Sequence, residues 1–137
     1  MQKLVIRRPV IVNVIMTEQF RKELLTDIQA RQKKLEEDIK SLEIGVSKEI
    51  ARRALTEPKE ASLLTRQLES DKERLTKLGE DLIRQMETVN NIPEGQEVPF
   101  WTLDGWVEIG VGDDLRQKTT QTQIVIKDWQ VVEVRNP

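Results

Sequence analysis

The chain has 137 residues, a formal net charge of −2 and charged side chains at 34% of its positions, a composition that fits one soluble domain better than a protein that coats nucleic acid. It contains no cysteine, histidine or tyrosine, which excludes disulfides, thiolate chemistry and cysteine-based zinc sites and removes the usual general bases. The longest apolar stretch, residues 10–16 interrupted by Asn13, is too short to span a bilayer and lacks a secretory cleavage site. We therefore expect a soluble, cytoplasmic protein with no membrane partner.

The first predicted element is a β-strand over residues 3–16, KLVIRRPVIVNVIM, because β-branched residues dominate it and most of its apolar residues share one parity. Pro9 cannot donate a hydrogen bond to a neighbouring strand, so it implies an edge position or a bend. Arg7 and Arg8 have no acidic residue near them in sequence. They are therefore candidates to bind phosphate, or else to pair with the acidic strands at the end of the chain.

Residues 17–91 are predicted to form two long antiparallel helices joined by a tight turn near residues 55–58. Thr17 can cap the first helix, and Pro58 suits the first turn of the second. On each helix, apolar residues recur every seven positions in two interleaved rows, the heptad pattern of a coiled coil. The predicted contact residues are Leu25, Ile28, Leu35, Ile39, Leu42 and Val46 on the first helix, and Ala61, Leu64, Leu68, Leu75, Leu78, Leu82 and Val89 on the second.

Some residues do not fit this simple pattern. Gln32, Asp71 and Gln85 fall on contact positions, where each either fixes the register or turns to solvent, and Asp71 could otherwise be a buried acid with a shifted pKa. Gly45 could end the first helix early. Apolar residues outside the two rows suggest a second contact, through which hairpins pair into a homo-oligomer or hold client proteins as a chaperone. They are Leu24, Ile44, Ile50, Leu63, Ile83 and Met86.

The turn between the helices carries Lys48, Arg52, Arg53 and Lys59, with Glu49, Glu57 and Glu60 interleaved. Such a cluster could contact RNA phosphates. The even mixture of signs favours an ordinary solvated surface.

Residues 92–137 are predicted to be strands and loops. VPFWTL and WVEIGV flank Asp104-Gly105, which predicts a two-residue hairpin turn, and GDDLRQKTTQ is predicted to be a polar loop. Asp113 and Asp114 could bind a Ca²⁺ ion, but the other spaced acidic residues of a calcium-binding loop are absent. We favour a polar turn with a strand bulge at Gly110, and we assign no metal, no cofactor and no catalytic residue.

TQIVI and VVEVR are predicted to pair as the last hairpin, with Trp129 at a tip where Gly or Asn is usual. A two-residue loop at 128–129 would place Glu133 on the apolar face, so we expect a three-residue loop. The last residue of such a loop, Trp129 or Gln130, would adopt the left-handed conformation at a cost of about 1–2 kcal/mol. Something should therefore hold Trp129 in place.

Three tryptophans lie in the C-terminal strands: Trp101, Trp106 and Trp129. In a small β domain such side chains mostly form the core or cover a sheet. Exposed, they could instead stack on RNA bases or grip a peptide. With Arg7 and Arg8 they make up the candidate binding surface.

Three stretches together resemble the YlqD family of small uncharacterised bacterial proteins: LVIRRPVIVNVIMTEQF, GQEVPFWTLDGWVEIGVGDDL and QIVIKDWQVVEVR. The resemblance covers nearly the whole chain, although the helices contribute little because any coiled coil would match. The family pattern has Gly where this chain has Trp129. The resemblance implies a bacterial cytoplasmic protein, and it brings no activity, cofactor or catalytic residue.

The predicted fold is α+β, with residues 1–16 and 92–137 in a small sheet or barrel and 17–91 in a coiled-coil hairpin. The predicted function is non-enzymatic: a homo-oligomeric adaptor that assembles through the hairpin and binds an unknown protein. One alternative is an RNA- or ribosome-associated protein that binds through Arg7, Arg8 and the tryptophan-bearing strands. The other is a holdase chaperone that uses the hairpin.

Overall fold

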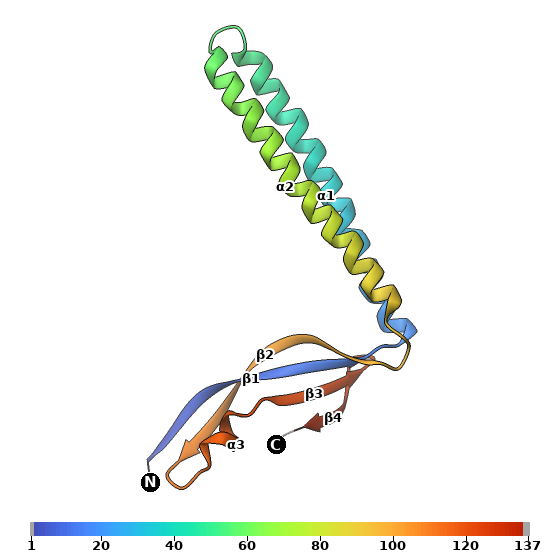
Figure 1. Ribbon diagram of the computed structural model, residues 1–137, viewed down its shortest axis with the longest axis vertical. Helices are drawn as coiled ribbons and strands as arrows, with labels where there is room; N and C mark the ends of the chain where they lie inside the picture. Colours follow the sequence, from blue (N-terminus) through green and yellow to red (C-terminus); the bar gives the residue numbers. More distant parts are fainter. Residues whose placement is uncertain (1, 136–137) are drawn as a thin grey trace. The chain divides into compact units, whose positions relative to one another are not determined.

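The structure, a computed structural model, describes residues 2–135, whose contacts divide the chain into two units (Figure 1). The β unit contains the residues up to Arg21 and those from Ile92 onward, and the helical unit contains Lys22–Asn91. One strand precedes two long helices, and a strand, a short helix and two strands follow them. The predicted α+β class is confirmed.

The two helices have the lengths and the turn that the sequence predicts. Helix α1 spans Glu18–Arg53 and helix α2 spans Pro58–Asn91, with a short turn between them. The Thr17 hydroxyl accepts a hydrogen bond from the Phe20 amide at 3.1 Å and so caps α1. Pro58 is the first residue of α2, where its missing N–H costs nothing.

Three contacts between the helices define an antiparallel register. Lys72 and Glu43 form an ion pair of 2.7 Å, and Arg53 and Glu60 form one of 2.8 Å beside the turn. Farther from the turn, Gly79 lies against Leu35: a Cβ at Gly79 would stand 3.4 Å from Leu35 Cδ2.

The structure corrects the predicted contact rows at one leucine. The predicted residues of α1 are buried or half-buried, whereas on α2 Leu78 is 45% exposed and Gly79 takes its place at the contact. Gln85 is likewise exposed while Met86 is half-buried. A straight helix drifts by roughly 20° per heptad relative to a strict seven-residue repeat. In the second half of α2, one of the two contact rows therefore moves by one residue, whereas Leu82 and Val89 of the other row stay half-buried.

Helix α1 runs through Gly45 without a break, and a Cβ at this exposed position would meet nothing within 4 Å. Gly45→Ala should therefore stabilise the helical unit by about 1 kcal/mol, because alanine loses less backbone entropy in a helix. Thermal unfolding followed by circular dichroism measures the gain. Gly79→Ala is the matched control and should gain less, because its Cβ would stand 3.4 Å from Leu35 Cδ2, at the close limit of van der Waals contact; an equal gain at both sites would contradict this.

The sheet of the β unit has the strand order β2-β1-β3-β4. Strand β1 spans Lys3–Ile15, β2 Glu97–Gly110, β3 Thr122–Lys127 and β4 Gln130–Arg135. Strand β1 is antiparallel to β2 along its whole length but parallel to β3 only over Val10–Val14. The first half of β1 and the second half of β2 thus form a two-stranded ribbon that extends beyond the four-stranded part. The sheet is open, with β2 and β4 as its edges.

Two predictions for the stretch between Glu97 and Thr120 are wrong. Asp104-Gly105 is no turn: it lies within the continuous strand β2, opposite Pro9 and Arg8. A Cβ at Gly105 would come within 2.8 Å of Val10 Cγ2, so the glycine permits a close approach between strands. The predicted polar loop contains a short helix, α3, at Leu115–Thr119, which Asp114 caps by accepting a hydrogen bond from the Arg116 amide.

The last hairpin also differs from its prediction. Asp128 and Trp129 form a two-residue turn with φ values of 49° and 69°, so both are left-handed. Ile126 pairs with Val131 and Val125 with Glu133, which makes Val132 an extra, bulged residue. The bulge restores the face of the apolar residues, which we expected a three-residue loop to do.

The core of the β unit lies where β1 and β3 pair. Val12, Val14 and Met16 of β1 and its extension are almost completely buried, as is Val125 of β3. Because successive residues of a strand point to opposite faces, burial of both Val12 and Asn13 shows that both faces of the sheet are covered here.

Candidate functional site

Four aromatic side chains form a cluster over the Val12 face of the sheet. Phe20, in the first turn of α1, contacts Phe100 and Trp129 edge to face, with ring centroids 5.3 and 5.6 Å apart. Trp101 contacts Phe100 at 4.7 Å and Trp129 at 6.0 Å. A bulge in β2 between the partners of Val12 and Asn13 allows the consecutive residues Phe100 and Trp101 to join the same cluster.

These contacts hold Trp129 at its strained turn. A left-handed residue with a Cβ costs roughly 1–2 kcal/mol of folding free energy, and each aromatic pair stabilises the fold by about 0.5–1.5 kcal/mol. Thr17 adds a hydrogen bond from its hydroxyl to Asp128 Oδ1 at 2.6 Å. The same hydroxyl that caps α1 therefore fixes the tip, although 57% of the Trp129 surface remains exposed.

A polar strap crosses the opposite face of the sheet and joins its two edge strands. The Arg135 guanidinium of β4 donates to both carboxylate oxygens of Glu97 on β2, at 2.7 and 2.8 Å. The buried Asn13 amide donates to Glu97 at 3.2 Å and to Gln123 at 3.3 Å, so each strand contributes one side chain. Sequence analysis missed the strap because Glu97 and Arg135 lie 38 residues apart.

The strap makes stability depend on pH. The hydrogen bond from Arg135 lowers the pKa of Glu97, and Arg135 itself has a raised pKa. A carboxyl whose folded pKa is depressed stabilises the fold above its unfolded value, about 4.3, and this stability is lost as pH falls through the folded value.

We therefore expect the urea midpoint of the wild type to fall as pH is lowered from about 5 to about 3. Glu97→Gln should flatten this part of the pH profile, and Arg135→Met should do the same. Glu108→Gln is the control, because Glu108 pairs with Lys3 in an exposed ion pair that should contribute little. Equal profiles for Glu97→Gln and the wild type would contradict this role.

The predicted surface residues are not brought together on one face. Arg7 and Trp106 are cross-strand partners on the Asn13 face, while Arg8 and Trp101 belong to the Val12 face. Arg7 pairs with Asp104 at 3.5 Å, and Arg8 donates to the Lys118 carbonyl at 3.3 Å.

The basic residues of β1 thus form ion pairs within the β unit. Lys3 pairs with Glu108 at 3.0 Å, and Arg7 pairs with Asp104. This is the attraction between basic and acidic strands that the sequence suggested as an alternative to phosphate binding. Trp106 remains 69% exposed.

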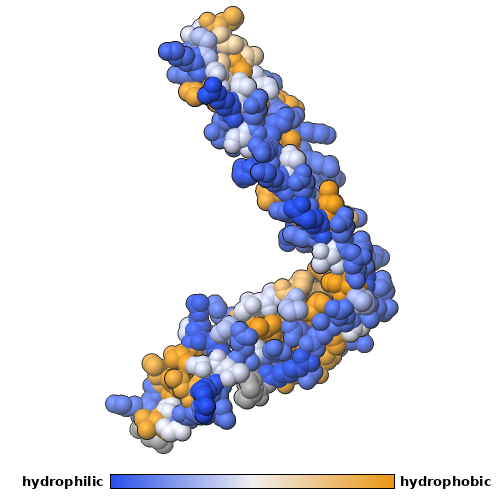
Figure 2. Space-filling model, in the orientation of Figure 1, coloured by the Kyte–Doolittle hydropathy of each residue, from blue (hydrophilic) through white to orange (hydrophobic). Residues whose placement is uncertain are grey.

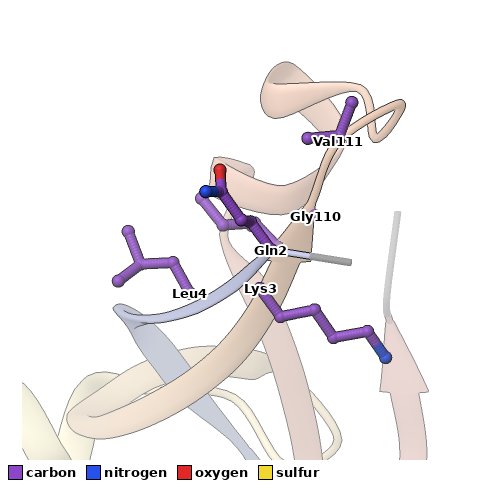
Figure 3. A pocket seen from close by; sticks show the side chains of 6 residues that line it. Gln2, Lys3, Leu4, Gly110 and Val111 are labelled. Carbon is purple, nitrogen blue, oxygen red and sulfur yellow. The ribbon is translucent and has the colours of Figure 1, made fainter.

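The free end of the β1–β2 ribbon exposes an apolar surface. Leu4, Val111 and Leu115 are 61%, 87% and 59% exposed, and Figure 2 shows apolar side chains gathered over this end of the unit. Here lies an open, shallow depression of about 510 Å³, lined by Gln2, Lys3, Leu4, Ile109, Gly110 and Val111. In Figure 3, Leu4 and Lys3 leave β1 in opposite directions, as the alternation of a strand requires.

The remaining candidates have structural partners. Asp113 accepts a hydrogen bond from the Gly110 amide at 2.8 Å, and Asp114 caps α3. Asp71 accepts one from Gln67 on its own helix at 3.0 Å. Within residues 2–135, no group of three or more acidic side chains is placed to hold a metal ion.

The cluster beside the helix turn is a network of ion pairs. Glu49 contacts Arg52 at 2.6 Å and Arg53 at 2.7 Å, and these hydrogen bonds lower its pKa. Glu57 has a raised pKa because it shares a hydrogen bond with Glu60. The signs are mixed here, which matches the solvated surface that the sequence favoured.

Three comparisons relate the chain to known proteins. The family model described as "YlqD protein" matches residues 4–135. The "Uncharacterized protein YlqD" of Bacillus subtilis (strain 168) is 39% identical over 51 residues, or 37% of this chain and 40% of that protein, so the match spans less than half of that relative.

A crystal structure of a protein of unknown function from Synechococcus sp. WH 8102 has the same fold. Its TM-score is 0.85 with 20% sequence identity, over 97% of this chain and 95% of that one. No helix within residues 2–135 is long and apolar enough to cross a membrane.

Proposed function

The chain belongs to the YlqD protein family, and from this premise we propose that it is a non-enzymatic interaction protein that self-associates and binds a further protein through its β unit. The observation that carries the proposal is the apolar surface of the β unit. Leu4, Val111 and Leu115 are each more than half exposed and gather at the free end of the β1–β2 ribbon, and Val131 and Val134 are exposed on one face of the edge strand β4. Apolar surface left uncovered to this extent marks contact sites for other proteins.

The helical unit supports the proposal in a different way. Ile44, Leu63 and Ile83 are 59%, 62% and 51% exposed, but on the helices they stand apart from one another rather than in a second stripe. Single exposed apolar residues are common on protein surfaces. The paired helices are therefore suited to be a stiff spacer, and we place the main contacts on the β unit.

Binding to RNA has less support because Arg7 and Arg8 lie on opposite faces of the sheet and each already has a partner. Arg7 and Lys3 form ion pairs with acidic residues of β2, and Arg8 is bound to a backbone carbonyl. A surface that binds phosphates would need several unpaired cations on one face.

The proposal is tested by sedimentation of the purified chain over a range of concentrations, with and without nuclease. We expect a mass that exceeds the 15.9 kDa of one chain as concentration rises, and no effect of nuclease. Tagged protein recovered from its own cells should carry another protein and no RNA. A monomer at every concentration whose recovered material is RNA would contradict the proposal.

A further inference from the structure

Strand β4 is the less protected of the two sheet edges. Its three valines, Val131, Val132 and Val134, are 60%, 54% and 61% exposed, and within the described residues no strand pairs with its outer side. Both edges carry charged residues, but only the other edge, β2, also carries a proline, Pro99, and proline is a usual means of keeping an edge from pairing.

The bulge decides which valines of β4 share a face. Val131 pairs with Ile126 and Val134 with Ile124, so both point to the Val12 face, on which the aromatic cluster lies. Trp129, more than half exposed, immediately precedes this strand. Val131 and Val134 therefore share one face of the sheet, whereas Val132 is the bulged residue between them.

We propose that β4 pairs antiparallel with β4 of a second copy of this chain, so that Val131 of each copy lies opposite Val134 of the other. The proposal rests on the self-association proposed above, and it names the surface and the partner. A two-fold axis between the strands produces both contacts at once and joins two sheets into one of eight strands. Backbone hydrogen bonds supply the affinity, as in other cases of strand addition.

Charges in β4 favour this register over its neighbours. It places Gln130 opposite Arg135 of the second copy, and Glu133 opposite Val132. A shift of one residue in one direction would set Glu133 against Glu133 of the second copy, which repel each other. A shift in the other direction would set Val131 against Glu133. Of these three registers, only the proposed one sets both Val131 and Val134 against apolar side chains without opposing like charges.

Lysines on the edge test the proposal, because lysine is a natural means of blocking an edge strand. For Val131→Lys combined with Val134→Lys, we expect the apparent mass in sedimentation to fall to one chain at a concentration where the wild type is dimeric. Unchanged circular dichroism and unfolding temperature would show that the variant folds. Leu63→Lys with Ile83→Lys is the matched variant on α2, with the same charge and similar exposure, and should sediment like the wild type.

Cysteine cross-linking tests the register independently, since the chain has no cysteine of its own. A mixture of Val131→Cys and Val134→Cys proteins should form a mixed disulfide several-fold faster than either protein forms one with itself. Directly opposite residues lie within the distance that a disulfide spans.

The possible results separate the two proposals. If the lysine pair on β4 sediments like the wild type dimer, or if the pair on α2 dissociates it, the β4 contact is overturned while self-association stands. If the wild type is monomeric at every concentration, both fail.

Discussion

Replacing Phe20 by alanine is expected to lower the free energy of unfolding of the β unit by about 3–5 kcal/mol. Phe20 is 1% exposed and contacts both Phe100 and Trp129. Its loss leaves a cavity beneath two rings and removes the packing that offsets the left-handed turn at Trp129. The effect should thus lie in the upper part of the range for a buried phenylalanine.

Urea unfolding followed by tryptophan fluorescence measures this change, because Trp101, Trp106 and Trp129 all lie in the β unit. Circular dichroism reports mainly on the long helices and provides a second probe. Phe100→Ala is the control: Phe100 is 41% exposed and its loss should cost clearly less. A loss below about 1 kcal/mol for Phe20→Ala would show that the cluster does not hold the unit together.

The helices and the first strand could be predicted from sequence because their signals are local. Thr17 and Pro58 mark helix starts, and the spacing of apolar residues along each helix is visible without any knowledge of its partner. Among the predicted apolar contact residues the seven-residue rule failed only at Leu78, where the drift of a straight helix accumulates.

The last hairpin could not be predicted because its geometry depends on a bulge. The alternation of TQIVI and VVEVR correctly showed that a plain two-residue loop conflicts with the apolar pattern. An odd loop and a bulge at Val132 resolve that conflict equally well, and sequence does not distinguish them. The chain forms the bulge, so Asp128 and Trp129 are both left-handed, with the strain at Trp129, and Gln130 begins β4.

Only the part of the candidate site that depends on composition could be predicted from sequence. The basic first strand and the acidic later strands were expected to attract each other, and they form the ion pairs Lys3–Glu108 and Arg7–Asp104. The strap of Glu97 and Arg135 requires the strand order, which places one residue on each edge. Which tryptophans share a face likewise depends on the register of β2, including the bulge beside Trp101.

Gly105 explains why the strongest turn signal in the sequence was misleading. Asp-Gly is favoured in two-residue turns because glycine adopts positive φ, but Gly105 is not among the residues with positive φ. Its lack of a side chain serves packing instead: a Cβ there would stand 2.8 Å from Val10 Cγ2 and 3.0 Å from the Arg8 carbonyl oxygen.

Gly105→Ala is therefore expected to destabilise the β unit by about 1–3 kcal/mol, although alanine ordinarily suits a strand better than glycine. Gly110→Ala is the matched control in the same strand, since a Cβ there meets nothing nearer than 3.7 Å. In a Val10→Ala background the cost of Gly105→Ala should shrink, because the closer of the two clashing atoms is gone. If Gly105→Ala costs as much in that background as it does in the wild type, the glycine is required by the backbone alone, and the approach of the Val10 side chain to β2 is not what selects it.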